Sequence, residues 1–198
     1  MSSKKIVIFI YFVLVLLLSV SKVYSIEPDV FVQSTVNRAA KTLGGNFTKE
    51  ERIKKLKEIA AETVDIKGIG YYTLGAYRKD LNDEQIKQYV LLFEQYFLKS
   101  FSSRLAEYSN PEIEVVSKKK INENYTMVSS ILVATDQRPV VEIDWRIYTK
   151  NLEDPKIRDL IIEGLSLART QKEEFSSIIE SNDGDINALF SSLKEFIK

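Results

Sequence analysis

The chain has 198 residues, with 28 basic and 28 acidic side chains, and it contains neither cysteine nor histidine. This composition excludes disulfide bonds, cysteine nucleophiles, histidine general bases and the usual zinc ligand sets, so the familiar hydrolase triads are unavailable. At this length the chain can form one domain with a substantial hydrophobic core.

Residues 1–25 have the features of a secretory signal peptide. Two lysines precede the apolar run Ile6–Leu18, whose 13 residues are fewer than a membrane-spanning helix needs (about 20), so cleavage after Ser25 is favoured over an uncleaved anchor. This segment holds three of the 28 basic residues and no acidic one, so residues 26–198 carry 25 basic and 28 acidic side chains. That slightly acidic balance does not favour nucleic acid as a partner.

The first half of the exported chain has the residue spacing of helices. Apolar residues three and four apart predict a helix over Pro28–Leu43. A capping box formed by Thr48 and Glu51 predicts a second helix that ends near Val64. A third helix is predicted from Asn82 to about Tyr108. Its aromatic stripe is bulky for a domain of this size, which is typical of a core but also suits the lining of a lipid-sized space.

Between the second and third helices, the segment Asp65–Tyr77 contains Gly68, Gly70 and Gly75. Each glycine in a helix costs roughly 1 kcal/mol relative to alanine, so a close approach to another element or to a ligand is expected in compensation. The glycine spacing matches neither the dinucleotide-binding fingerprint nor the P-loop, and a phosphate-binding loop is therefore not favoured.

From Glu112 the apolar period changes to two, which predicts strands. Four are expected, at about 113–115, 125–134, 140–149 and 157–163, separated by polar turns that include the lysine run 118–120. Helices over 166–181 and 185–197 complete the chain. Helices, then an antiparallel sheet, then helices form an α+β layout.

The third of these strands alternates most clearly. Its apolar face carries Val141, Ile143, Trp145 and Ile147, and its polar face carries Glu142, Asp144 and Arg146. Such a strand is expected to turn one face to the core and the other to solvent. The only tryptophan, Trp145, is then either a core side chain or the wall of a ligand pocket.

Five short sequence motifs occur in a characteristic order, and together they extend over nearly the whole exported chain. They are Leu74-Gly75-Ala76-Tyr77, the aromatic helix with Tyr89, Phe93 and Tyr96, the Arg138-Pro139 turn with Val141–Trp145, Asp159–Ser166, and Phe175–Ile179. Together they resemble the MlaC-type periplasmic phospholipid-binding proteins, also called the toluene-tolerance family. One departure is Lys172, where the family has an arginine ahead of Glu174-Phe175, so a bidentate contact of that arginine would be lost.

The resemblance implies a periplasmic carrier of a Gram-negative bacterium, with residues 26–198 as a single lipid-binding domain. Its fold would be a cone-shaped α+β roll of N-terminal helices, a four-stranded antiparallel sheet and C-terminal helices. The ligand would be a glycerophospholipid whose acyl chains occupy a cavity between sheet and helices. At about 0.8 kcal/mol per methylene, roughly 30 acyl methylenes supply on the order of 20 kcal/mol, far more than one charged hydrogen bond to the head group.

The resemblance also implies partners: an inner-membrane ABC/MCE-type complex and an outer-membrane lipoprotein complex between which the lipid is shuttled. No catalytic residue, metal or cofactor other than the bound lipid is expected. The expected lipid contacts lie on the apolar strand faces, the helix stripe and the glycine segment, and are Leu74, Phe93, Phe97, Ile131, Val141, Ile143, Trp145, Ile161 and Leu165.

Two other functions stay open on the residues alone. One is a small-molecule isomerase or dehydratase on a cystatin-like α+β roll, which uses an acid in an apolar pocket. Its candidates are Asp65, Asp144 and Asp159, although the strand pattern turns Asp144 toward water. The other is a structural adaptor without a ligand.

Overall fold

A computed structural model describes residues 25–108, 111–136 and 138–198 of the chain, so all but the last residue of the predicted signal peptide lies outside the described residues. The helices are α2 (Pro28–Gly44), α3 (Lys49–Thr63), α4 (Ile66–Leu74), the 3-10 helix η1 (Gly75–Asp80), α5 (Asp83–Leu105), α6 (Leu167–Glu180) and α7 (Ile186–Ile197). The strands are β1 (Ile113–Asn122), β2 (Tyr125–Leu132), β3 (Val141–Tyr148), β4 (Lys156–Ile162) and β5 (Leu165–Ser166). This is the expected α+β order.

The strands form one antiparallel sheet in the order β1-β2-β3-β4-β5. The four predicted strands are present, and β5 is an additional short one. It exists because Glu163 and Gly164 adopt positive φ values of 50° and 78°, which turn the chain back so that Ser166 pairs with Ile161. The helix predicted from Ser166 therefore begins one residue later, with Ser166 as its N-cap.

The prediction of a turn at the lysine run 118–120 is wrong. These lysines belong to β1 and pair with Val128, Met127 and Thr126, and the chain reverses only at Glu123-Asn124. Exposed lysines suit this strand because β1 lies at the edge of the sheet, where charged side chains deter pairing with other chains. Part of that edge is also covered by α2. The side-chain amide of Gln33 on α2 accepts a hydrogen bond from the Val115 N–H and donates one to the Ile113 carbonyl.

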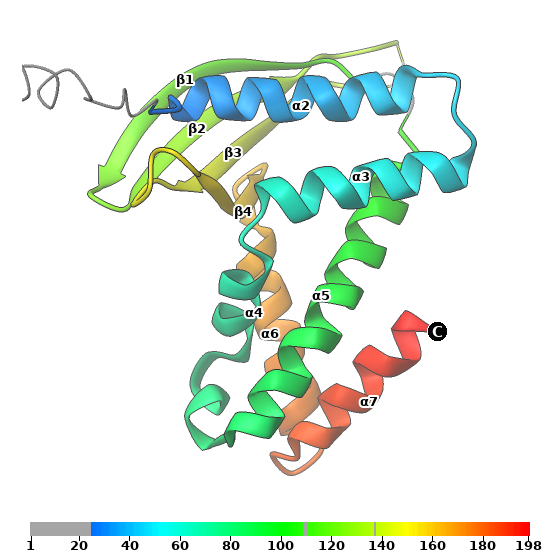
Figure 1. Ribbon diagram of the computed structural model, residues 1–198, viewed down its shortest axis with the longest axis vertical. Helices are drawn as coiled ribbons and strands as arrows, with labels where there is room; N and C mark the ends of the chain where they lie inside the picture. Colours follow the sequence, from blue (N-terminus) through cyan, green and yellow to red (C-terminus); the bar gives the residue numbers. More distant parts are fainter. Residues whose placement is uncertain (1–24, 109–110, 137) are drawn as a thin grey trace, which may run out of the picture.

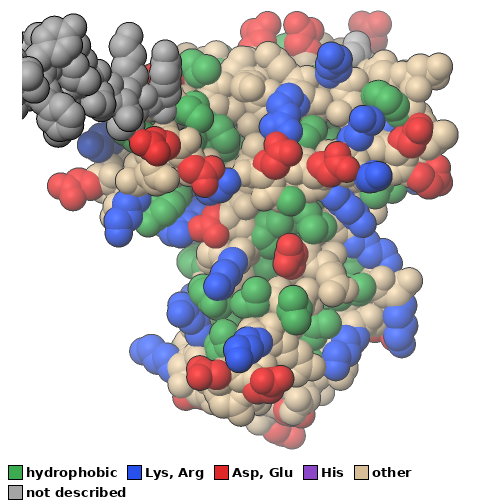
Figure 2. Space-filling model, viewed as in Figure 1, with side chains coloured by type: hydrophobic (Ala, Val, Ile, Leu, Met, Phe, Trp, Pro, Cys, Tyr) green, Lys and Arg blue, Asp and Glu red, His purple; other side chains and the backbone are tan. Residues whose placement is uncertain are grey.

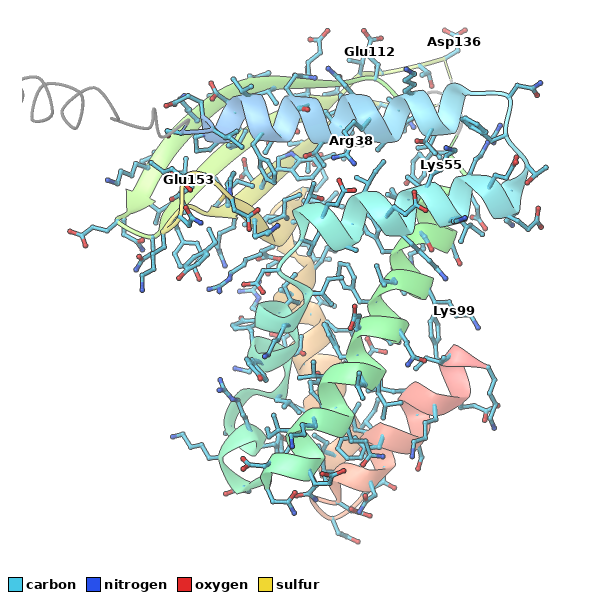
Figure 3. The ribbon with its side chains drawn as sticks, in the orientation of Figure 1. Arg38, Lys55, Lys99, Glu112, Asp136 and Glu153 are labelled. Atoms are coloured by element: carbon cyan, nitrogen blue, oxygen red, sulfur yellow. The ribbon has the colours of Figure 1, made fainter. Side chains whose placement is uncertain are left out.

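The sheet, α2 and α3 form the upper part of the molecule, and α4, α5, α6 and α7 form a helical arm that extends below it (Figure 1). The predicted capping box of Thr48 and Glu51 starts α3. Arg38 on α2 faces α3 and forms an ion pair there with Glu62 (Figure 3). Within the arm, Lys99 of α5 donates to the carbonyl of Ile197, 3.1 Å away, and so joins α5 to the end of α7 (Figure 3).

Acidic and basic side chains are interspersed over α2 and α3, whereas hydrophobic side chains gather below α3 over the upper part of the arm (Figure 2). Inside, one apolar cluster joins the sheet to the arm. It contains Val32 and Val36 of α2, Val128 of β2, Trp145 and Ile147 of β3, Phe93 of α5 and Phe175 of α6. The sheet and the arm therefore share one apolar core.

On β3, Ile143, Trp145 and Ile147 are buried, and the indole N–H of Trp145 donates to Ser130 Oγ at 2.8 Å. The alternation predicted that the opposite face of β3 would be exposed to solvent, and this is only partly correct. Only Glu142 is exposed there, whereas Asp144 and Arg146 are half-buried. The reason is tertiary: α4 and the start of α6 lie beside Arg146, where they enclose a cleft.

Gly70 of α4 allows a close approach to α5, as expected. A Cβ at Gly70 would lie 2.8 Å from Cδ1 of Phe93, closer than carbon atoms pack. Beside it, Thr73 Oγ1 and the Tyr89 hydroxyl are 2.7 Å apart in a buried hydrogen bond. Burial raises the pKa of Tyr89, so the phenol is neutral at physiological pH. This contact fixes α4 on α5.

Replacing Gly70 with alanine tests that packing. We expect a net loss of about 1 kcal/mol in the free energy of unfolding, because overpacking costs about 1 to 3 kcal/mol and the gain in helix propensity returns only about 1. Urea denaturation measures the change. In a Phe93→Leu background the same substitution is expected to be neutral or stabilising, and an equal cost in both backgrounds would contradict the contact.

Candidate functional site

A cleft of about 670 Å³ lies between α4 and the polar face of the sheet, a size common among small-molecule sites. Tyrosine and arginine side chains dominate its wall. The lining residues are Gly68, Ile69, Tyr71, Tyr72, Arg78, Ile121, Asn122, Tyr125, Arg146, Arg158 and Ala168. They come from α4, η1, four segments of the sheet and α6, so only the folded chain brings them together.

Arg158 is the most firmly held of the three arginines. It is the unpaired residue of a β-bulge in β4. Its neighbours Asp159 and Ile157 pair with Arg146 and Ile147, which are consecutive on β3. Its Nε donates to Asp65 Oδ2 and its Nη1 to the Tyr125 hydroxyl, each at 2.7 Å. Its guanidinium carbon also lies 3.7 Å from the centre of the Tyr148 ring, a cation–π contact.

Partial burial alone would lower the pKa of Arg158. Its hydrogen bonds to Tyr125 and Asp65 and the negative charge of Asp65 outweigh that effect, and the pKa is raised above its usual value. Arg158 is therefore cationic at physiological pH.

Asp65 also positions the helix that forms the opposite wall of the cleft. Its Oδ1 accepts from the Gly68 N–H at 2.8 Å and so caps the start of α4. The backbone just before it joins the sheet, because Val64 bridges to Ile157 and the Asp65 N–H donates to the Ile157 carbonyl. The first turn of α4 is thus tied to β4.

Arg146 is placed by a buried acid. Asp159 has a side chain that is 1% exposed and lies 3.4 Å from Arg146 Nη1. The same carboxylate accepts from Ser166 Oγ at 2.6 Å and from the Ala168 N–H at 3.0 Å. Asp159 therefore holds both Arg146 and the start of α6 at the edge of the cleft.

Arg78 comes from η1, and its guanidinium carbon lies 4.1 Å from the centre of the Tyr71 ring. Among the described residues it forms no ion pair with an acid. Lys172, the departure from the family pattern, lies outside this cleft, with its Nζ 5.4 Å from the centre of the Tyr72 ring.

The floor of the cleft is apolar. Ile69 and Ala168 line the cleft and also belong to the main hydrophobic core, so they separate the two. Cationic walls over an apolar floor suit an amphiphilic ligand with an anionic head. In the described part of the chain, no group of three or more acidic, histidine or cysteine residues could hold a metal ion.

None of the nine residues expected to bind lipid lines this cleft. Leu74, Phe93, Ile143 and Trp145 are buried, Phe97, Ile131, Val141 and Ile161 are half-buried, and Leu165 is exposed. By strand register, Ile131 and Ile161 lie on the same face of the sheet as Arg146, whereas Val141, Ile143 and Trp145 lie on the other. As lipid contacts, all nine stay a prediction.

Sequence reasoning missed the arginines. It assigned Arg146 to a solvent-facing strand surface, and it gave Arg78 and Arg158 no role. The alternation of β3 does place Arg146 opposite Trp145, but it does not show that α4 covers that face. The three acids considered for an enzyme all have structural partners: Asp65 and Asp159 as above, and Asp144, which accepts from Ser129 Oγ at 2.6 Å.

These features define an α+β roll with an arginine-lined cleft between its sheet and its helical arm. Residues 32–195 match the MlaC protein family, and the chain belongs to that family. Among solved structures it is similar to a phospholipid-binding protein from Ralstonia solanacearum determined in complex with a phospholipid. That match has a TM-score of 0.73 at 20% sequence identity, and it covers 86% of this chain and 97% of the other.

The anchoring role of Asp159 can be tested with Asp159→Asn. Two hydrogen bonds and an ion pair to a buried carboxylate are weakened, so we expect the free energy of unfolding to fall by about 1.5 to 3 kcal/mol. The matched control is Asp154→Asn, because its ion pair with Lys156 involves a side chain that is 63% exposed. The control is expected to change stability by less than about 0.5 kcal/mol in urea denaturation. Equal effects of the two substitutions would contradict the anchor.

Proposed function

We propose that the protein is a carrier of glycerophospholipid, which it binds at the cleft between α4 and the sheet. The observation that supports this most directly is the membership of the MlaC family over residues 32–195, together with a cleft that combines cationic walls and an apolar floor. The similar Ralstonia protein was solved with a phospholipid, and its fold extends over 86% of this chain.

The acyl chains need more apolar surface than the cleft wall offers. Its aliphatic lining residues are Ile69, Ile121 and Ala168, whereas burial of the chains supplies most of the affinity. We therefore propose that the chains pass the floor at Ile69 and Ala168 and enter the core behind it, where Leu74 and Phe93 lie. The predicted contacts at Ile143 and Trp145 would be reached only from inside that core.

The carrier is proposed to work in the periplasm, to which the predicted signal peptide would direct it. It would exchange lipid between an inner-membrane ABC/MCE-type complex and an outer-membrane lipoprotein complex. No helix among the described residues is long and apolar enough to cross a bilayer. The ligand itself is the only cofactor proposed, and no catalytic step is required of the protein.

The direct test is to purify the protein from its own compartment, extract it with organic solvent and identify the lipids by mass spectrometry. We expect phospholipid in amounts comparable to the protein. An extract without phospholipid would contradict the carrier function, and a small polar metabolite in its place would favour the isomerase or dehydratase.

Ile69→Trp tests the route of the acyl chains. The larger ring narrows the floor but can extend into the open cleft, so the cost of overpacking, about 1 to 3 kcal/mol, leaves the protein folded. We expect this variant to lose most of its co-purified phospholipid, whereas the control Ile69→Val retains it. A folded Ile69→Trp protein with wild-type lipid content would show that the chains take another path.

A further inference from the structure

We propose that Arg78, Arg146 and Arg158 form a binding site for a phosphodiester group that carries a single negative charge. This rests on the proposed carrier function and names the part of the lipid that the cleft recognises.

The charges in the cleft call for one anion. Three guanidinium groups line it and no carboxylate does. Two acids that do not line the cleft neutralise the charges of two of these arginines: Asp65 pairs with Arg158, and Asp159 pairs with Arg146. Arg78 has no such acid among the described residues, so the site holds one unbalanced positive charge. A phosphodiester at neutral pH carries the matching charge.

Hydrogen-bond donors also remain available. Arg158 uses Nε and Nη2 for Asp65 and one Nη1 hydrogen for Tyr125, which leaves further N–H groups on both terminal nitrogens. Within the described structure the Arg146 guanidinium forms one ion pair, with Asp159 at 3.4 Å. Arg78 lies over the Tyr71 ring, and a cation–π contact uses the face of the guanidinium and leaves its N–H groups available to a ligand.

Two of the three arginines are held in place before any ligand arrives. Arg158 is fixed by two hydrogen-bond partners and the Tyr148 ring, and Arg146 by an acid that cannot turn to solvent because it is buried. Fixed donors lose little conformational entropy on binding, which favours affinity. Planar arginine forks also match the oxygens of a phosphate group better than lysine does.

This chemistry selects a class of lipid. Anionic and zwitterionic glycerophospholipids both present the phosphodiester to the three arginines, whereas diacylglycerol has the acyl chains without it. Free inorganic phosphate has the anion without the chains. These three ligands therefore separate the contribution of the head group from that of the chains.

The test is calorimetric titration of the exported protein, freed of co-purified lipid, with dihexanoyl phosphatidylglycerol, dihexanoylglycerol and inorganic phosphate. For Arg78→Gln we expect phosphatidylglycerol to bind about tenfold to a hundredfold more weakly, the range for loss of a charged hydrogen bond. Its affinity for dihexanoylglycerol is expected to stay unchanged. Arg78 is exposed, so the variant should fold, which thermal melting checks.

The matched control is Arg104→Gln, which removes the same charge from an exposed position of α5 away from the cleft and is expected to change no affinity. Arg158→Lys keeps the charge but loses the planar fork, and is expected to weaken phosphatidylglycerol binding as well.

Three results would overturn the phosphodiester site while leaving the carrier function intact. They are equal binding of phosphatidylglycerol and dihexanoylglycerol by the wild type, wild-type affinity in Arg78→Gln, or an equal loss in Arg104→Gln. If inorganic phosphate binds as tightly as phosphatidylglycerol, the arginines form a site for a free anion, and the claim that they recognise a lipid head group is contradicted. Failure to bind either short-chain lipid, with no phospholipid in the native extract, would instead overturn the carrier function.

Discussion

The cleft depends on one interaction, the pairing of Asp65 with Arg158. A single carboxylate caps α4 through the Gly68 N–H and binds a guanidinium that protrudes from the irregular stretch of β4. Both side chains are partly exposed, so the pair contributes more to position than to stability. It sets the distance between the first helix of the arm and the sheet, and with it the width of the cleft.

The second constraint is the separation of cleft from core. Ile69 and Ala168 close the floor, and the Asp159 carboxylate holds Ala168 there through its backbone N–H. Behind them the packing is tight, since Gly70 allows α4 to lie directly on the Phe93 ring. A lipid that enters from the cleft must displace part of this packing. The proposal therefore requires the arm to adjust as the acyl chains enter, while Arg146 and Arg158 stay fixed on the sheet.

Much of the fold follows from local patterns. The capping box at Thr48 and Glu51, the alternation of β3 and the order of helices and strands all depend on neighbouring residues, and they predict the α+β layout. The predictions from sequence are wrong or incomplete where contacts between distant parts of the chain determine the local structure. The lysines of β1 resemble a turn by composition but pair as an edge strand, and β5 exists only because two residues adopt positive φ.

The site was harder to predict for the same reason. Arg78 lies 68 residues before Arg146, and Arg158 lies on the next strand after Arg146; each by itself has the pattern of an ordinary surface charge. Their convergence requires α4 to cover the polar face of the sheet, which periodicity does not reveal. The register shift that projects Arg158 into the cleft is likewise a property of strand pairing and not of the residues on either side.

The central claim is that the cleft receives the phosphate and the core receives the chains. The most direct measurement is a crystal structure of the protein with its naturally bound lipid. The account predicts phosphate density within hydrogen-bond distance of Arg78, Arg146 and Arg158, with acyl density passing Ile69 into the arm. Acyl chains that enter elsewhere, with these arginines free of phosphate, would contradict it.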